Sequence, residues 1–229
     1  MKRWQLDYRR GLRWLSRHRP LRAMHYFERA LMHIPTARGR SSLSLRRDLA
    51  RLFYFFAVAL RQVGLRNRSV ASLVEASRLY KRGCARAGLF HAVNRYGMAR
   101  QPTPEHDDQQ AFYGIQLAHY VRSKQSHRLG TRAEIDMVSE LIDEYWAEIR
   151  RLDLASMSSV EKCRLFSDTM IVFPFITVPN ALKTDDLIVD FRSGRRADPH
   201  DRCTCGSGLP VCLCHGRIPG IDEVLVGLF

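Results

Sequence analysis

What the sequence lacks narrows the class of protein first. It has no run of about 18 consecutive apolar residues, so no membrane-spanning helix is expected. The basic start, residues 1–10, is not followed by the apolar stretch of a secretory signal. Because disulfides form in oxidising compartments, these two absences predict a cytoplasmic protein whose cysteines are reduced.

Recognisable catalytic motifs are missing too. The chain has no phosphate-cradling glycine loop, no G-x-S-x-G turn around a nucleophile and no H-E-x-x-H metal motif. Of its nine histidines, the eight other than His215 are scattered and form no spaced set of partner residues. The sequence therefore predicts a protein that is not an enzyme. A hydrolase or transferase without sequence motifs is the alternative.

Acidic residues are scarce in the first part of the chain. Residues 1–100 hold 23 Lys and Arg against 4 Asp and Glu, whereas residues 101–190 hold 9 against 15. The net charge of the whole chain, +14, thus comes from its N-terminal part. Such an asymmetry is typical of proteins that bind an acidic partner or a polyanion. A GC-rich genome or a solvated helix face would give the same arginine bias without any function.

Length and composition predict one main domain with a small appendage. The chain has 229 residues, of which 45% are hydrophobic and 10% aromatic, and this is enough to bury a core. We expect a helical domain over residues 1–192, basic in 1–100 and acidic in 101–190. Residues 193–229 are expected to form a linker, a small cysteine-rich module and a hydrophobic tail.

The string from Cys203 to Gly216 holds four of the six cysteines and one histidine, arranged around two glycines. Thiolates and an imidazole form a tetrahedral shell for zinc, and four such ligands leave no open position for chemistry. Gly206 and Gly208 permit the tight turn that brings the sulfurs together, because glycine adopts positive φ without steric cost. Ser207 is expected to donate to the thiolates.

The same string resembles the SEC-C motif, a zinc module found at the C-terminus of the SecA protein-export ATPases and in many unrelated bacterial proteins. The pattern of that family is C-x-C-G-S-G, a short basic run, and then C-H or C-C followed by Gly. The resemblance implies one structural Zn²⁺ held by Cys203, Cys205, Cys214 and His215.

Two departures from the family pattern leave alternatives open. The run after Gly208 is Leu-Pro-Val-Cys-Leu and is not basic. The resemblance therefore does not imply that this chain binds the export chaperones or ribosomes that family members are thought to bind. Cys212 is an additional cysteine and permits a second ligand set, Cys203, Cys205, Cys212 and Cys214. A pair of disulfides is the alternative without a metal.

Residues 4–35 predict two antiparallel helices joined by a turn. Gly11 and Ala23 are small enough for the helices to approach closely, and Trp14 and Phe27 fill the space around them. The pattern resembles one tetratricopeptide repeat of roughly 34 residues. A second copy is poorly matched, so an ordinary helical hairpin is an equal alternative.

Apolar residues recur every three or four positions through most of the remaining chain. The expected helices cover residues 41–64, 69–88, 89–98, 103–126, 131–152 and 158 to just before Pro174. Cys84 is expected in the core, and residues 187–191 are expected to form a short strand. The predicted fold class is mostly α, with antiparallel helical hairpins, tetratricopeptide-like or in an irregular bundle, and a small C-terminal zinc module.

These features together predict a non-catalytic cytoplasmic adaptor or regulatory chaperone. Grooves between helices bind peptides or helices of other proteins, and the zinc module would be a structural or docking unit. The predicted partner-binding residues are Arg9, Arg13, Arg17, Arg22 and Arg29. The alternative is a regulator that binds RNA, DNA or the ribosome through its arginine-rich part.

Overall fold

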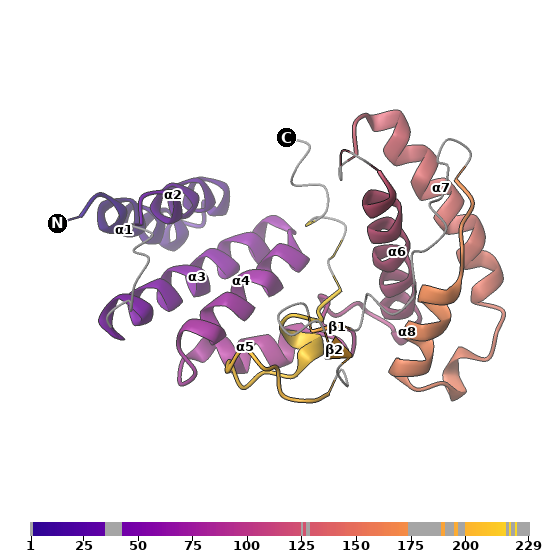
Figure 1. The fold of residues 1–229 in the computed structure, drawn as a ribbon. Helices are drawn as coiled ribbons and strands as arrows, with labels where there is room; N and C mark the ends of the chain where they lie inside the picture. The colour runs from indigo at the N-terminus through magenta and orange to yellow at the C-terminus, as the bar shows by residue number, and fades with distance from the viewer. Residues whose placement is uncertain are drawn as a thin grey trace. The chain divides into compact units, whose positions relative to one another are not determined.

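The computed structural model describes residues 2–34, 43–124, 126, 129–173, 189–190, 195–196, 200–218, 220 and 223. Within them lie eight α-helices: α1 Arg3–Ser16, α2 Pro20–Met32, α3 Leu43–Val63, α4 Arg66–Leu79, α5 Cys84–Ala92, α6 Pro104–Ser123, α7 Arg132–Ile149 and α8 Ser159–Asp168. Two short strands, β1 (Val189–Asp190) and β2 (Arg195–Arg196), pair antiparallel. The prediction of a mostly α fold is confirmed (Figure 1).

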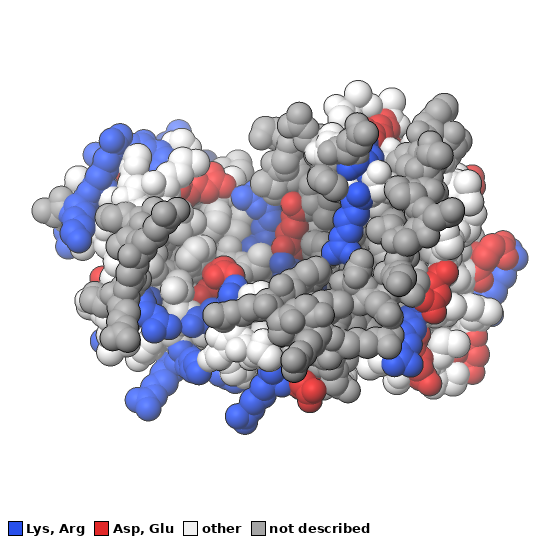
Figure 2. Space-filling view, viewed as in Figure 1, with Lys and Arg blue, Asp and Glu red and all other residues white. Residues whose placement is uncertain are grey.

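The chain divides into two compact units, unit 1 (Met1–Ala92) and unit 2 (Val93–Phe229). Unit 1 carries 21 Lys and Arg against 4 Asp and Glu, a net charge of +17, whereas unit 2 has a net charge of −3. In the face that Figure 2 shows, acidic side chains gather over the part of unit 2 that contains α7. The predicted domain boundary at residues 192 and 193 lies outside the described residues and stays a prediction.

The α1–α2 hairpin closes around Phe27, which is fully buried. A Cβ added at Gly11 would lie 2.5 Å from the Phe27 ring, so only glycine allows α1 to approach α2 this closely. Ala23 is also fully buried, whereas Trp14 is only partly buried against the same cluster. The predicted hairpin is therefore confirmed, and its identity as a tetratricopeptide repeat stays a prediction.

Helix α3 packs against both α2 and α4 and supplies the centre of the unit 1 core. Leu52, Phe56 and Leu60 share one face at helical spacing and are buried. The helix ends, as predicted, at Gly64, whose φ is +93°. Its predicted N-cap, Ser41 or Ser42, lies outside the described residues.

The predicted start of the next helix at Ser69 is wrong, because α4 begins at Arg66. Ser69 is buried within the helix, and its hydroxyl donates to the carbonyl of Ala57 at 2.8 Å. A serine before an apolar run is typical of a helix cap. Here the Ser69 hydroxyl instead forms a hydrogen bond that joins α4 to α3.

The predicted helices over 69–88 and 89–98 are also corrected. Helix α4 ends at Leu79, and Cys84 opens the separate helix α5, where it is exposed and not in the core. After α5, an isolated bridge pairs Val93 with Ala99. The side chain of Asn94 accepts from the backbone N–H groups of residues 96 and 98 at 3.0 Å, which replaces helical hydrogen bonds with a turn.

Helices α6, α7 and α8 form the core of unit 2 around three aromatic rings. The centroid of Phe112 lies 5.7 Å from that of Trp146 and 5.6 Å from that of Phe166. The predicted cap Thr103 accepts from the backbone N–H of residue 106 at the start of α6. Ser158 forms the complete capping box of α8, so local sequence set both helix starts.

A buried ion pair also joins α6 to α8. Lys162 Nζ lies 2.5 Å from Asp108 Oδ2, and both side chains are buried. The Tyr96 hydroxyl donates to Asp108 Oδ1 at 2.5 Å, and the Arg95 guanidinium is 3.5 Å from the same oxygen. The pair and these additional contacts fix the turn before α6 against both helices, because a buried carboxylate is costly unless its oxygens are paired.

None of the described helices combines the length and apolar character that crossing a membrane requires.

Candidate metal centre

The cysteine-rich segment, residues 200–218, folds as a compact double turn that we call the module. Its first turn is closed by the Cys203 N–H, which donates to the Leu209 carbonyl at 2.8 Å. Gly206 and Gly208 have φ values of +76° and +73°, which confirms the predicted need for glycine at both positions. The short 3₁₀ helix Val211–Leu213 then carries the chain back toward the first pair of cysteines.

This fold brings together Cys203, Cys205, Cys214 and His215, whose ligand atoms all lie within 4.8 Å of one another. The Sγ atoms of Cys205 and Cys214 are 3.5 Å apart. The Nδ1 atom of His215 lies 3.1 Å from Cys203 Sγ and 3.6 Å from Cys214 Sγ. The group could therefore hold one metal ion.

The spacing of these atoms fits a tetrahedral ion. Zinc bonds of about 2.3 Å to sulfur and 2.0–2.1 Å to nitrogen place neighbouring ligand atoms about 3.5–3.8 Å apart. Two of the three contacts match this range, and the third is slightly shorter. All six cysteines are free thiols, and 3.5 Å exceeds a disulfide bond of about 2.05 Å. The predicted disulfide alternative is thus not formed.

The two facing thiols of the group have pKa values that are shifted in opposite directions. Burial opposes a charge on Cys205, but hydrogen bonds from the Ser207 side chain and backbone outweigh it and lower the pKa of the Cys205 thiol to about 6. Burial raises the pKa of Cys214 to about 12, because its thiolate would lose solvation. The Ser207 hydroxyl also lies 3.5 Å from Cys214 Sγ, as its predicted role requires. A bound divalent ion supplies the charge that stabilises buried thiolates.

The module is anchored to the rest of unit 2 by apolar side chains and one close backbone contact. Leu209 and Val211 are buried to within 1% of full burial, and Ile218 joins the core of α6–α8. A Cβ at Gly97, which has φ of +74°, would lie 2.0 Å from the Cys212 carbonyl oxygen. The backbone of the turn that contains Gly97 therefore lies directly against the module.

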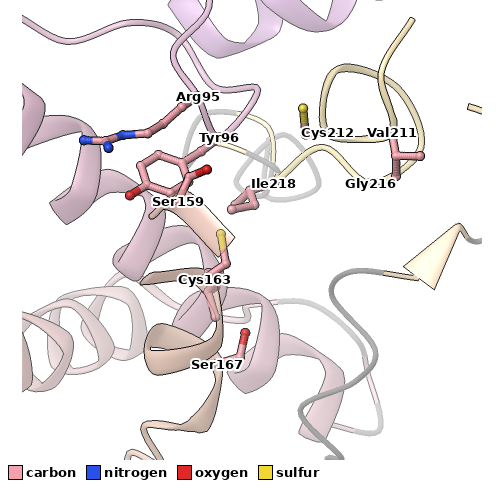
Figure 3. Close-up of a pocket in the computed structure, with 10 residues that line it drawn as sticks. Arg95, Tyr96, Ser159, Cys163, Ser167, Val211, Cys212, Gly216 and Ile218 are labelled. Atoms are coloured by element: carbon pink, nitrogen blue, oxygen red, sulfur yellow. The ribbon is translucent and has the colours of Figure 1, made fainter. Parts of the chain in front are cut away.

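Cys212, the alternative ligand, does not join the group of four. It lines a pocket between the module and α8, together with Cys163, Ser167 and Tyr96 (Figure 3). Burial, the neighbouring Cys212 and Asp108 raise the pKa of the Cys163 thiol to about 12, which favours its protonated form at neutral pH. The structure thus separates the additional cysteine from the predicted ligand set.

Three of the predicted partner-binding arginines form one stripe along α1. Arg9 and Arg13 are exposed and lie one turn apart on the same face of α1. Arg17, the exposed C-cap residue of the helix, follows them, and its guanidinium lies over the Trp14 ring at 5.7 Å from the centroid. The stripe continues onto α2, where the guanidinium of Arg22 lies over the Trp14 ring at 4.6 Å from its centroid. Such stacking holds an arginine in place while leaving its charge accessible.

Arg29, the fifth predicted arginine, has a different environment. It lies 3.6 Å from the buried carboxylate of Asp7 on α1, and Arg10 approaches the same carboxylate at 3.9 Å. Burying Asp7 without a cation would be costly, so this contact stabilises the hairpin. The arginine contributes to folding, whatever its role toward a partner.

Sequence reasoning missed the groups that hold the module and the core together. Asp108 and Lys162 lie 54 residues apart, and each is typical of a solvated helix face. Gly97 lies in a segment predicted to be helical, where a glycine does not indicate a close contact with a distant part of the backbone. The one available signal was the Asn94–Gly97 spacing, which is typical of a turn.

Comparisons of this chain with protein-family models, with curated proteins and with solved structures give no match.

Proposed function

We propose that this protein is a non-catalytic adaptor or regulatory chaperone with a structural zinc module. It binds an acidic segment of a protein partner through the α1–α2 hairpin. The observation that carries the proposal is the Cys₃His group, whose ligand atoms lie close enough to surround one ion. When bound, zinc supplies a four-way cross-link, and four protein ligands leave no position for a substrate.

The soft donor set supports zinc over hard cations. Thiolates and imidazole suit Zn²⁺, whereas Mg²⁺ and Ca²⁺ prefer oxygen ligands. Cys203 and Cys214 are buried, as is typical of structural sites. The surrounding residues hold the ligands in place: Ser207 contacts Cys214, and the two glycines set the turn.

The basic surface supports a partner that is acidic. Unit 1 has a net charge of +17, and Arg9, Arg13 and Arg17 of the α1 stripe are exposed. Arginine forks bind carboxylates in a bidentate manner. The hairpin also supplies the rigid pair of helices on which such a stripe keeps its spacing.

Two measurements test the proposal. Metal analysis of the purified chain should find one zinc per molecule; a fully folded chain without metal would contradict the structural site. Affinity capture from nuclease-treated lysate should retain a protein on the wild type and lose it on Arg9→Gln/Arg13→Gln/Arg17→Gln. Capture that depends on intact nucleic acid would favour the alternative, an RNA- or DNA-binding regulator.

That alternative is favoured by the same charge separation, since a polyanion also binds a surface of +17. It predicts that binding weakens steeply as salt rises, because released counterions supply the affinity. Little change in affinity between low and high salt would exclude it. The two functions are therefore separated by salt dependence and nuclease treatment together.

A further inference from the structure

A second site lies within unit 1, where one face of α3 meets the end of α4 and the start of α5. Its α3 residues follow the i, i+3, i+4, i+7, i+8 pattern and so share one face of the helix. They are Arg47, Ala50, Arg51, Tyr54 and Phe55. Opposite them lie Ala76, Tyr80, Arg82 and the first residues of α5, and the pocket, which is open to solvent on one side, has a volume of about 470 Å³.

The pocket is strongly basic. Arg47, Arg51 and Arg82 line it and are exposed, and no aspartate or glutamate is among its described lining residues. Other arginines of unit 1 are neutralised, as Arg68 is by Glu28 and Arg78 by Glu75. Within the described part of the chain, none of the three lining arginines has such an ion pair. Asp48 follows Arg47 on α3 but is not among the residues that line the pocket. Three arginines around a pocket whose described lining contains no carboxylate favour an anionic ligand.

The pocket is also aromatic. Tyr54, Phe55 and Tyr80 are half-buried along it, and the ring centroids of Tyr54 and Phe55 are 5.3 Å apart at an angle of 76°. The guanidinium of Arg47 lies over the Tyr80 ring, 5.3 Å from its centroid. Aromatic rings beside arginines that form no ion pair within the described residues are the combination on which nucleobases stack and phosphates bind.

The floor between these groups is made of small buried residues. Ala50, Ala76 and Ala85 leave the space that larger side chains would fill. Helix α5 starts at Cys84 beside Arg82, and the positive end of its dipole adds to the field of the arginines.

We propose that this pocket binds a nucleoside phosphate, with its base against Tyr54 and Tyr80 and its phosphate between Arg47, Arg51 and Arg82. The ligand is either a free nucleotide or one nucleotide of a single strand, because both present the same base and phosphate. An acidic peptide would also satisfy the arginines, but it lacks a flat base that could contact the half-buried rings of Tyr54 and Tyr80. The proposal goes beyond the adaptor function and does not depend on the zinc module.

Calorimetric titration of the full chain tests this with five probes: AMP, adenosine, inorganic phosphate, a glutamate-rich peptide and a single-stranded 12-nucleotide oligo(A). AMP should bind at least about tenfold more tightly than adenosine or phosphate alone, because each lacks one half of the recognised group. Oligo(A) binding much more tightly than AMP would identify a single strand as the source; equal affinity per site would identify a free nucleotide.

Matched variants separate the pocket from general charge. Arg47→Gln/Arg51→Gln/Arg82→Gln should weaken AMP binding at least about tenfold. Arg3→Gln/Arg19→Gln/Arg61→Gln removes the same charge at exposed positions outside both proposed sites and should weaken AMP binding less than twofold. Tyr80→Phe should keep the affinity and Tyr80→Leu should lower it. Circular dichroism checks that each variant is folded.

Four outcomes would overturn the proposal. They are the absence of saturable binding of AMP and oligo(A), equal loss in the two arginine triples, phosphate binding as tightly as AMP, and pocket-dependent binding of a glutamate-rich peptide in place of AMP. None of them bears on zinc content or on capture through the α1 stripe. Failure of this site and failure of the proposed function are therefore distinguishable.

Discussion

Gly97 shows how much one missing methyl group matters to this protein. Its Cβ would overlap the Cys212 carbonyl oxygen, and its φ of +74° disfavours other residues. Gly97→Ala should lower the free energy of unfolding by about 2–5 kcal/mol, since left-handed backbone strain and overpacking add. Urea unfolding followed by far-UV circular dichroism measures the change.

Gly64→Ala is the matched control, because Gly64 has φ of +93° but nothing within 4 Å of an added Cβ. Gly64→Ala should lower the free energy of unfolding only through left-handed backbone strain, by about 1–2 kcal/mol. If both variants lose the same free energy, the close contact with Cys212 does not stabilise the module.

The ligand set can be tested cysteine by cysteine. Cys214→Ser should abolish stoichiometric metal binding, because it removes one of four grouped donors. Cys212→Ser should retain one metal per chain, since Cys212 lines the pocket beside α8 instead. Metal analysis after dialysis checks both variants. Loss of metal in Cys212→Ser with retention in a His215→Ala variant would reverse the assignment.

The sequence predicted which four residues come together in the module but not the residues that hold the module in place. A short string of cysteines and glycines carries its own turn geometry, so Gly206 and Gly208 were predicted at positive φ and are found there. Gly97 and Cys212 are far apart in the chain, and nothing local in either segment indicates the other. Contacts of this kind depend on how the whole unit packs.

Helices α6 and α8 depend on the buried pair between Asp108 and Lys162. Asp108→Asn would leave the Lys162 ammonium buried without a counter-charge and should destabilise the protein by about 3–5 kcal/mol. The double variant Asp108→Leu/Lys162→Met removes both charges and should lose less than the single variant. Urea unfolding measures both.

The exposed pair Arg132–Asp136 on α7 gives the control for that prediction. Both side chains are more than half exposed. Arg132→Gln should therefore change the free energy of unfolding by no more than about 1 kcal/mol. Equal effects of Asp108→Asn and Arg132→Gln would show that the buried pair is not needed for stability.

A carboxylate between α6 and α7 should make stability depend on pH. Burial opposes the charge on Glu134, but hydrogen bonds from Lys124, the Tyr120 hydroxyl and the Gly130 N–H outweigh it and lower the Glu134 pKa from 4.5 to about 2. A lowered folded-state pKa means that stabilisation is complete above pH 4.5 and is lost as the pH falls from 4.5 through 2.

Glu134→Gln should therefore be less stable than the wild type at pH 7, and the difference should shrink as the pH falls through that window. Thermal unfolding at a series of pH values measures it. Glu140→Gln, at an exposed position on the same helix, serves as the control. A constant difference from pH 6 to pH 2 would contradict the assigned cause.

Helix ends were predicted well wherever a capping side chain decides them. Thr103 and Ser158 cap α6 and α8 as expected, because the signal lies within four residues. At α7 only half of the predicted capping box forms: Thr131 accepts from the Glu134 N–H, but the Glu134 carboxylate accepts from Gly130. Ser69 does not cap a helix because its hydroxyl donates to the carbonyl of Ala57 on α3.

Metal removal should affect the two units differently. A chelator that strips the ion should expose the amides of residues 200–218 and of the turn around Gly97, because both belong to unit 2 and contact each other. Helices α1–α4 should keep their protection, since their core is built from unit 1 residues alone. Hydrogen exchange resolved by peptide tests this; uniform loss of protection would contradict two independent cores.

The contact between Gly97 and the Cys212 carbonyl also has a consequence for relatives of this chain. A side chain at position 97 would fit only if the loop carrying residue 212 took another path. We therefore expect these two distant segments to change together in descent, with glycine at 97 wherever the loop keeps its present length. Related sequences that have a bulkier residue at position 97 and an unaltered loop would contradict this expectation.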